Sequence, residues 1–195
     1  AVVMARTSLS PGVSCSIRRS SEPLTDTFAA RWQALQACRP SSSRLLAVSK
    51  GHPAASVRCV AEVGAGVAGL YAIHKLRGLG FEVKAFEAGD GVGGTWYWNR
   101  YPGCRCDVES LEYSFSFDPE LEQDWHWPER YGNQGEILEY VNHVADRFDL
   151  RRNIQFKTRV ISAQFEDKTG LWTIKTDKGE VVTAPYCIMA TGNLS

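Results

Sequence analysis

The stretch "VRCVAEVGAGVAGLYAIHKLRGLGFEVKAFEAGDG", residues 57–91, decides the fold of this chain. It opens with an apolar run, turns through glycines and continues with apolar residues at helical spacing, namely Leu70, Ile73 and Leu76. Gly78 and Gly80 end the helical pattern, and "EVKAFE" returns as a second strand. Strand, helix and strand in this order predict a right-handed βαβ unit with parallel strands.

The turn between the first strand and the helix has the spacing GxGxxG, formed by Gly64, Gly66 and Gly69. The first glycine permits the tight turn, the second lets a pyrophosphate approach the backbone, and the third lets the helix pack on the strand. Glu87 ends the second strand, where its carboxylate would accept hydrogen bonds from ribose hydroxyls and repel a 2′-phosphate. The pattern predicts a site for an adenine dinucleotide; a glycine-rich turn without a ligand is the competing interpretation.

Two charged residues disagree with this pattern, because Arg58 and Glu62 fall in what should be the most buried strand of a parallel sheet. Either that strand is splayed at its start, or the sequence there is imperfect.

The rest of the chain extends the domain. Residues 133–150 predict a helix with Asn133 as N-cap and Glu136 three residues on. Three short alternating strands follow, in "FKTRVISAQFE", "LWTIKT" and "EVVTA", joined by turn sequences that predict an antiparallel meander. A compact apolar strand, "YCIMATG", comes last and runs into Gly192. We therefore predict an α/β fold, a Rossmann-like parallel sheet with a small antiparallel β-meander, and expect the sequence to be a truncated one.

Residues 1–56 differ in composition, since they are rich in Ser, Arg and Ala and poor in acids. We predict a disordered extension there, with an organelle transit peptide as the alternative, and a domain over residues 57–195. Residues 59–195 carry 14 basic and 20 acidic side chains, which gives no electrostatic case for nucleic acid. The chain has no run of eighteen apolar residues and no secretory signal, so neither a membrane span nor export is predicted and a cytoplasmic location is expected.

Six scattered cysteines, none at zinc-knuckle spacing, predict reduced thiols and no metal site.

The segment "GVGGTWYWNRYPGCRCD", residues 91–107, combines glycines with large aromatic residues directly after Glu87. Glycines at positions 91, 93 and 94 would let backbone N–H groups approach a ligand, and flat side chains suit the broad apolar face of an isoalloxazine ring. Core packing and an ordinary turn are the competing interpretations of the same residues. Their position beside the predicted ribose site favours a flavin dinucleotide.

The segments "GAGVAGLYAIHKLRGLG", "GGTWYWNRYPGCRCDVES", "WHWPERY", "EILEYVNHVADRFDLR" and "IMATGNLS" together resemble the N-terminal FAD-binding part of Baeyer–Villiger flavin monooxygenases of the cyclohexanone and phenylacetone type. The resemblance runs from about residue 57 to residue 195.

The resemblance implies roles for individual residues. Gly64, Gly66 and Gly69 would hold the FAD pyrophosphate, and Glu87 the adenosine ribose. The flavin would be lined by Gly94, Thr95, Trp96, Tyr97, Trp98 and Tyr113. The backbone of Val160 would meet the adenine, and Gly192 would let the last strand approach the cofactor. Arg105, Cys106 and Asp107 would face flavin and nicotinamide, and Asp107 would serve catalysis by orienting an essential arginine.

In such enzymes NADPH reduces FAD and dioxygen then reacts, so that a ketone becomes an ester or lactone. The sequence lacks a second GxGxxG for NADPH and the arginine that Asp107 would orient. We therefore expect a fragment that is inactive alone; ketone-stimulated NADPH oxidation by this chain would refute that expectation.

Three other interpretations stay open. The first is the FAD-binding part of an N- or S-oxidising flavin monooxygenase, and the second is a non-catalytic nucleotide-binding remnant. A third, an NAD-dependent dehydrogenase, leaves the tryptophan-rich loop unexplained.

Overall fold

The computed structural model describes residues 3–4 and 59–192. They fall into two compact units, one of residues 3–4, 59–104 and 133–192 and the other of residues 105–132. The predicted disordered extension over residues 1–56 lies outside the described residues, apart from a two-residue strand.

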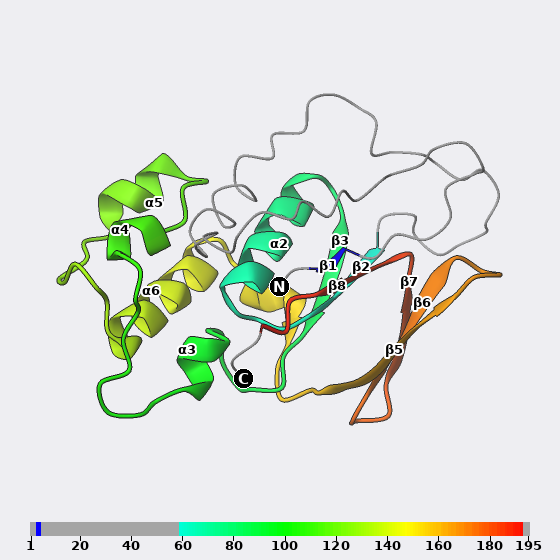
Figure 1. Ribbon diagram of the computed structural model, residues 1–195. Coiled ribbons are helices and arrows are strands. Elements are labelled where there is room, and N and C mark those ends of the chain that lie inside the picture. The colour runs from blue at the N-terminus through cyan, green and yellow to red at the C-terminus, as the bar shows by residue number, and fades with distance from the viewer. Residues whose placement is uncertain (1–2, 5–58, 193–195) are drawn as a thin grey trace, which may run out of the picture. The chain divides into compact units, whose positions relative to one another are not determined.

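The first unit contains a five-stranded sheet (Figure 1). Its order is β1 (Val3–Met4), β8 (Tyr186–Met189), β2 (Cys59–Val63), β3 (Glu82–Phe86) and β4 (Ile154–Gln155). Strands β8, β2, β3 and β4 are parallel, and β1 pairs with β8 in the antiparallel direction. The predicted parallel sheet is confirmed.

Helix α2 (Val67–Gly78) joins β2 to β3 and completes the predicted βαβ unit. The residues predicted to face the core are buried: Leu70, Ile73 and Leu76. Helix α6 (Gln134–Arg147) begins with the predicted N-cap, Asn133. The Asn133 side chain accepts a hydrogen bond from the Glu136 backbone N–H, and the Glu136 side chain accepts one from the Asn133 backbone N–H. A short 3₁₀ turn (Arg151–Asn153) then leads into β4.

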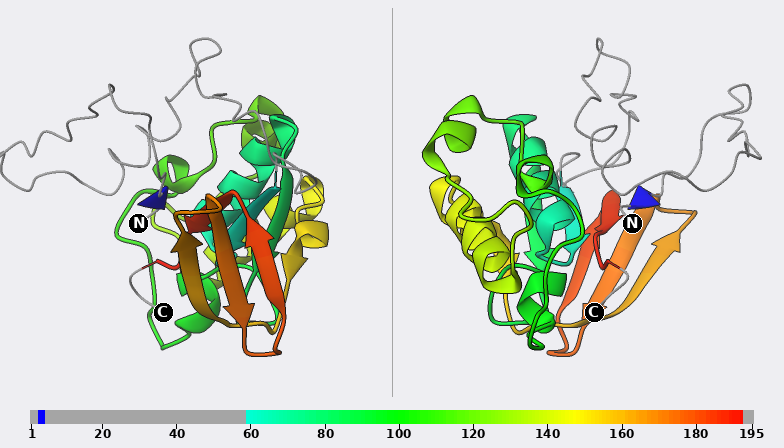
Figure 2. Two further views of the ribbon diagram at one scale, coloured as in Figure 1. Left: turned by 90° about the vertical axis from the view of Figure 1, so that its right-hand side faces the viewer. Right: turned by 60° about the vertical axis from the view of Figure 1, so that its left-hand side comes forward.

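The meander is confirmed as a separate antiparallel sheet of β5 (Val160–Glu166), β6 (Leu171–Thr176) and β7 (Val181–Ala184). It lies on one side of the parallel sheet, with α2 and α6 on the other (Figures 1 and 2). The core between the two sheets joins Ala61, Phe86 and Cys187 to Ile174 and Ala184. Burying this apolar face is what holds the meander against the parallel sheet.

Strand β2 is not splayed at the acidic residue that disagreed with the sequence pattern. Glu62 pairs with Ala85 on one side and Ile188 on the other, and its side chain is fully buried. Neither carboxyl oxygen has a hydrogen-bond partner among the described residues. Burial raises the pKa of Glu62 well above its usual range, because the low-dielectric interior disfavours the charged carboxylate. Arg58 lies outside the described residues.

The second unit is a small helical segment with α4 (Ser110–Tyr113) and α5 (Pro119–Asp124). Backbone hydrogen bonds join its ends, from Cys106 to the Gly132 carbonyl at 3.0 Å and from Ser110 to the Arg130 carbonyl at 2.8 Å. Over residues 59–192, no helix is long and apolar enough to cross a membrane.

Candidate functional site

A cavity of about 530 Å³ opens at the carboxyl ends of the parallel strands. Its walls come from five places. They are Val63, Gly64 and Gly66 at the end of β2 and in the glycine turn, residues 86–88 at the end of β3, Gly94 and Trp98 of the aromatic loop, residues 158–160 entering β5, and residues 190–192 after β8. Ligands of open α/β sheets bind at this edge. The volume is in the range of sites for small molecules and cofactors.

The glycine turn forms one wall, and close backbone packing accounts for two of its glycines. Gly64 has a φ of +107°, and a Cβ there would lie 2.5 Å from the Ala190 carbonyl oxygen. A Cβ on Gly69 would lie 2.0 Å from the Gly64 carbonyl oxygen. Gly66 lines the cavity as the N-cap of α2, and no side chain caps that helix among the described residues. The first N–H groups of α2 are thus suited to an anion.

Glu87 links this turn to the loop that follows β3. One carboxylate oxygen accepts from the Ala65 backbone N–H at 2.8 Å, and the other accepts from Gly89 N–H at 2.8 Å. The side chain is buried yet lines the cavity. Because each carboxylate oxygen has a second lone pair, Glu87 can hold both loops and still accept from a ligand hydroxyl.

The aromatic loop packs directly on the glycine turn. A Cβ on Gly94 would lie 2.8 Å from the Gly66 Cα, and the Gly93 N–H donates to the Ala65 carbonyl at 2.9 Å. Helix α3 (Thr95–Trp98) begins directly after this contact. Trp98 lines the cavity and is 46% exposed, whereas Trp96 is buried. The glycine turn and the aromatic loop therefore contact each other through Gly66 and Gly94. Because neither residue has a side chain, backbone atoms form this part of the cavity wall.

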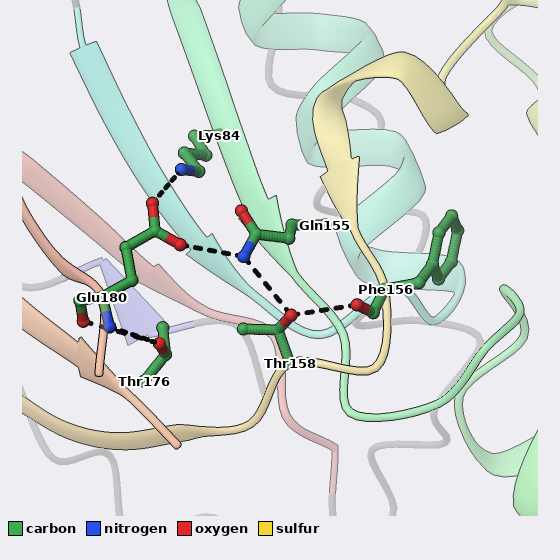
Figure 3. Close-up of polar contacts among 6 residues, drawn as sticks. All are labelled: Lys84, Gln155, Phe156, Thr158, Thr176 and Glu180. Atoms are coloured by element: carbon green, nitrogen blue, oxygen red, sulfur yellow. Dashed lines mark hydrogen bonds and ion pairs between the residues drawn. The ribbon is translucent and has the colours of Figure 1, made fainter. Parts of the chain in front are cut away.

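The wall at residues 158–160 is held by the network in Figure 3. The Gln155 amide donates to Glu180 at 2.8 Å, and Glu180 also forms an ion pair with Lys84. The hydrogen bond from Lys84, followed by that from Gln155, lowers the pKa of Glu180. The Thr158 hydroxyl donates to the Phe156 carbonyl at 2.9 Å, and its backbone N–H donates to the Glu87 carbonyl at 2.9 Å. The parallel sheet, the meander and this wall are thereby connected.

Charge in the cavity wall comes from Glu87 and Arg159 among the described lining residues. The cavity thus contains one carboxylate, one guanidinium and a helix N-terminus without a side-chain cap. The carboxylate can accept from hydroxyl groups, and the guanidinium and the helix N-terminus can bind phosphate groups.

Four further predicted site residues lie in the second unit. Arg105 is bonded to the Glu129 carboxylate and the Tyr131 carbonyl. Cys106 is buried, which raises the pKa of its thiol, Asp107 is exposed, and Tyr113 ends α4 half-buried. Arg105 is therefore held within its own unit, while the Asp107 carboxylate faces solvent.

The described residues form no disulfide and no cluster of metal-ligating side chains. The four described cysteines carry free thiols. Residues 59–192 contain no group of three His, Cys, Asp or Glu side chains able to hold a metal ion.

Comparisons with known proteins agree with this geometry. Residues 63–125 match the family described as NAD(P)-binding Rossmann-like domain. A solved structure titled oxidized steroid monooxygenase bound to NADP shares 61% identity over 68% of this chain and 26% of its own, with a TM-score of 0.67. A Baeyer–Villiger monooxygenase of Pseudooceanicola batsensis is 52% identical over 134 residues, 68% of this chain. The chain is homologous to part of the Baeyer–Villiger monooxygenases.

The Baeyer–Villiger resemblance stated from the sequence is thus confirmed, for part of the length of such proteins. The chain spans about 25% of the length of the P. batsensis protein. A phenazine N-monooxygenase of Lysobacter antibioticus is 49% identical over the same share of each chain. The same segment therefore occurs in monooxygenases named for different reactions.

The cavity brings together seven residues that the sequence singled out as Baeyer–Villiger cofactor residues: Gly64, Gly66, Glu87, Gly94, Trp98, Val160 and Gly192. Gly69, Thr95, Trp96 and Tyr97 lie in the same unit but are not among the lining residues. Sequence reasoning missed Thr158, Arg159 and Thr191, which line the cavity. Their only sequence signal was adjacency to Val160 and Gly192.

Proposed function

We propose that this chain forms the FAD-binding part of an NADPH-dependent monooxygenase that uses dioxygen to convert ketones into esters or lactones. The observation that carries the proposal is the cavity itself, where the start of α2 and the Glu87 carboxylate meet at the ends of parallel strands. The 52% identity to a Baeyer–Villiger monooxygenase supports the reaction class.

The residues present fit the adenosine diphosphate portion of FAD. Gly66 has no Cβ and lines the cavity at the start of α2, where a pyrophosphate would accept from backbone N–H groups. Glu87 has spare lone pairs for ribose hydroxyls. Val160 lies in the wall, and the adenine is expected against its backbone.

The aromatic loop fits the flavin portion. Trp98 presents a large, half-exposed indole to the cavity, which suits the apolar face of an isoalloxazine ring. FAD supplies the redox chemistry when bound, and the chain binds and orients it. Asp107 has an exposed carboxylate, in keeping with its proposed role of orienting an arginine.

Retention of FAD tests the binding part of the proposal. The purified chain is incubated with FAD and desalted, and its visible spectrum is recorded; flavin bands at about 370 and 450 nm are expected. The matched pair Gly66→Ala and Gly78→Ala separates the cavity from the rest of α2. A Cβ on Gly66 would lie 3.4 Å from the Cα of Gly94, another lining residue, whereas a Cβ on Gly78 meets nothing within 4 Å. Gly66→Ala should weaken FAD binding at least about tenfold, and Gly78→Ala should not. A colourless wild-type protein would refute the binding site.

The reaction class needs a second experiment, because the relative named as a phenazine N-monooxygenase favours N-oxidation as a second candidate. Residues 59–192 can replace the aligned segment in the P. batsensis protein and, separately, in the L. antibioticus protein. We expect NADPH- and ketone-dependent ester formation in the first chimera and weak N-oxide formation in the second. The reverse result would favour the second candidate.

A further inference from the structure

The ring of Tyr97 lies across the glycine-rich loop that follows β3. A Cβ on Gly89 would lie 2.8 Å from Tyr97 Cε1, and one on Gly91 would lie 3.1 Å from Cε2. A Cβ on Gly93 would lie 2.6 Å from Leu138 Cδ1 and 3.2 Å from the Tyr97 Cβ. Gly89 and Gly91 thus leave one side of the loop flat for the Tyr97 ring, and Gly93 leaves room for the Leu138 side chain. They serve packing within the protein, in contrast to the sequence-based expectation that positions 91 and 93 open the backbone to a ligand.

The hydroxyl of Tyr97 bonds to the same loop, which in turn contacts the segment before β5. It donates to the Asp90 carboxylate, and the Asp90 N–H lies 3.4 Å from the Tyr97 oxygen. Lys157 Nζ lies 3.7 Å from the other Asp90 oxygen, and the Lys157 N–H donates to the Gly89 carbonyl at 2.8 Å. Arg100 covers the ring from outside, with its guanidinium carbon 4.8 Å from the ring centre. Tyr97 is therefore held at its ring and at its hydroxyl.

The segments that these contacts connect carry three of the five cavity walls. Glu87 and Ala88 precede the glycine loop, Trp98 follows Tyr97 directly, and Thr158 follows Lys157 directly. Neither Tyr97 nor Asp90 nor Lys157 is itself among the lining residues. Their contacts act on the cavity through their neighbours in the chain.

We propose that Tyr97, through its hydrogen bond to Asp90, is a positioning residue that holds three walls of the cofactor cavity in register. The inference rests on the proposed function, because the walls matter through the ligand that they hold. The hydrogen bond lowers the pKa of Asp90 and raises that of Tyr97, so a hydroxyl donates to an ionised carboxylate across the neutral range.

The test compares Tyr97→Phe, Asp90→Ala and the double variant with two controls. Tyr97→Phe keeps the ring on the glycines and removes only the hydroxyl. Tyr186→Phe removes a hydroxyl from β8, and Asp167→Ala removes a carboxylate from the exposed β5–β6 turn. Amide hydrogen exchange and thermal unfolding are measured on the cofactor-free proteins, and FAD binding is measured by flavin fluorescence.

We expect Tyr97→Phe and Asp90→Ala to speed exchange in residues 87–98 and 157–160 about fivefold to twentyfold. FAD binding should weaken by a similar factor, while the unfolding temperature of the cofactor-free protein stays within the range of the controls. The double variant should lose no more than the larger single effect, because both substitutions remove one interaction.

Three results would overturn the inference: unchanged exchange in these segments, a fall in unfolding temperature that accounts for the loss of affinity, or additive effects in the double variant. If the wild-type chain binds no FAD, the proposed function fails, and the exchange data and their double-variant comparison still decide whether Tyr97 holds the walls.

Discussion

The Glu87 carboxylate accepts a hydrogen bond from the Ala65 backbone N–H at 2.8 Å, although the two residues are 22 positions apart. This contact joins the glycine turn after β2 to the end of β3, and the second carboxylate oxygen extends it to Gly89. The acid that the sequence marked for ribose binding is thus also part of the structure that shapes the cavity.

Glu87→Gln tests this double role. An amide group would place an NH₂ against one of two backbone N–H donors, so one buried donor loses its acceptor. We expect the free energy of unfolding to fall by about 1–3 kcal/mol, together with weaker FAD binding. Urea unfolding and FAD titration measure the two effects. Glu139→Gln on the exposed face of α6 is the control and should change neither; equal behaviour of the two variants would contradict the prediction.

Burial of Glu62 should make the stability of the protein depend on pH. Its pKa in the folded protein is raised by burial from the usual 4.5. Below that usual value the carboxyl is neutral in both the folded and the unfolded state, so burying it carries no cost of ionisation. As the pH rises, the unfolded chain releases the proton first, so stability is lost progressively up to the raised pKa.

Glu62→Val should therefore flatten the fall in stability that begins as the pH rises above 4.5, and it should raise the free energy of unfolding at pH 8 by at least about 1 kcal/mol. Glu62→Gln should flatten the same slope with little gain, since its amide stays buried without a partner. Urea unfolding at several pH values checks both. A slope that survives in both variants would assign the dependence to other groups.

Gly69 should behave differently from Gly66, although both belong to one motif. A Cβ on Gly69 would lie 2.0 Å from the Gly64 carbonyl oxygen and 2.6 Å from Glu62 Oε1. Because the first contact is with backbone, the turn and helix must move apart, and Gly69→Ala should cost about 1–3 kcal/mol of stability or more. Thermal unfolding measures the effect. Gly78→Ala is the matched control in the same helix, and an equal effect of the two substitutions would refute the packing argument.

The regular elements were predictable because their signals are local. Leu70, Ile73 and Leu76 at helical spacing, and Asn133 with Glu136, each specify an element from neighbours in the sequence. The site was only partly predictable, because its walls are set by contacts between distant loops. No pattern in the neighbouring sequence indicates that the Tyr97 ring packs on Gly89 or that Trp98 lines the cavity.

The two tryptophans of the aromatic loop, Trp96 and Trp98, allow a direct test of which one meets the ligand. Trp98 lines the cavity and is 46% exposed, whereas Trp96 is 8% exposed and its carbonyl accepts from the Gln134 side chain. FAD and ADP differ by the flavin portion, which is the part that Trp98 is proposed to meet, so the two ligands are compared. FAD binding is measured by flavin fluorescence and ADP binding by titration calorimetry. We expect Trp98→Phe to weaken FAD binding and to leave ADP binding nearly unchanged, and Trp96→Phe to leave the ratio of the two affinities unchanged, because only the Trp98 indole lines the cavity. Thermal unfolding confirms that each variant is folded. A loss of FAD affinity in Trp96→Phe but not in Trp98→Phe would mean that the ligand meets a different face of the aromatic loop.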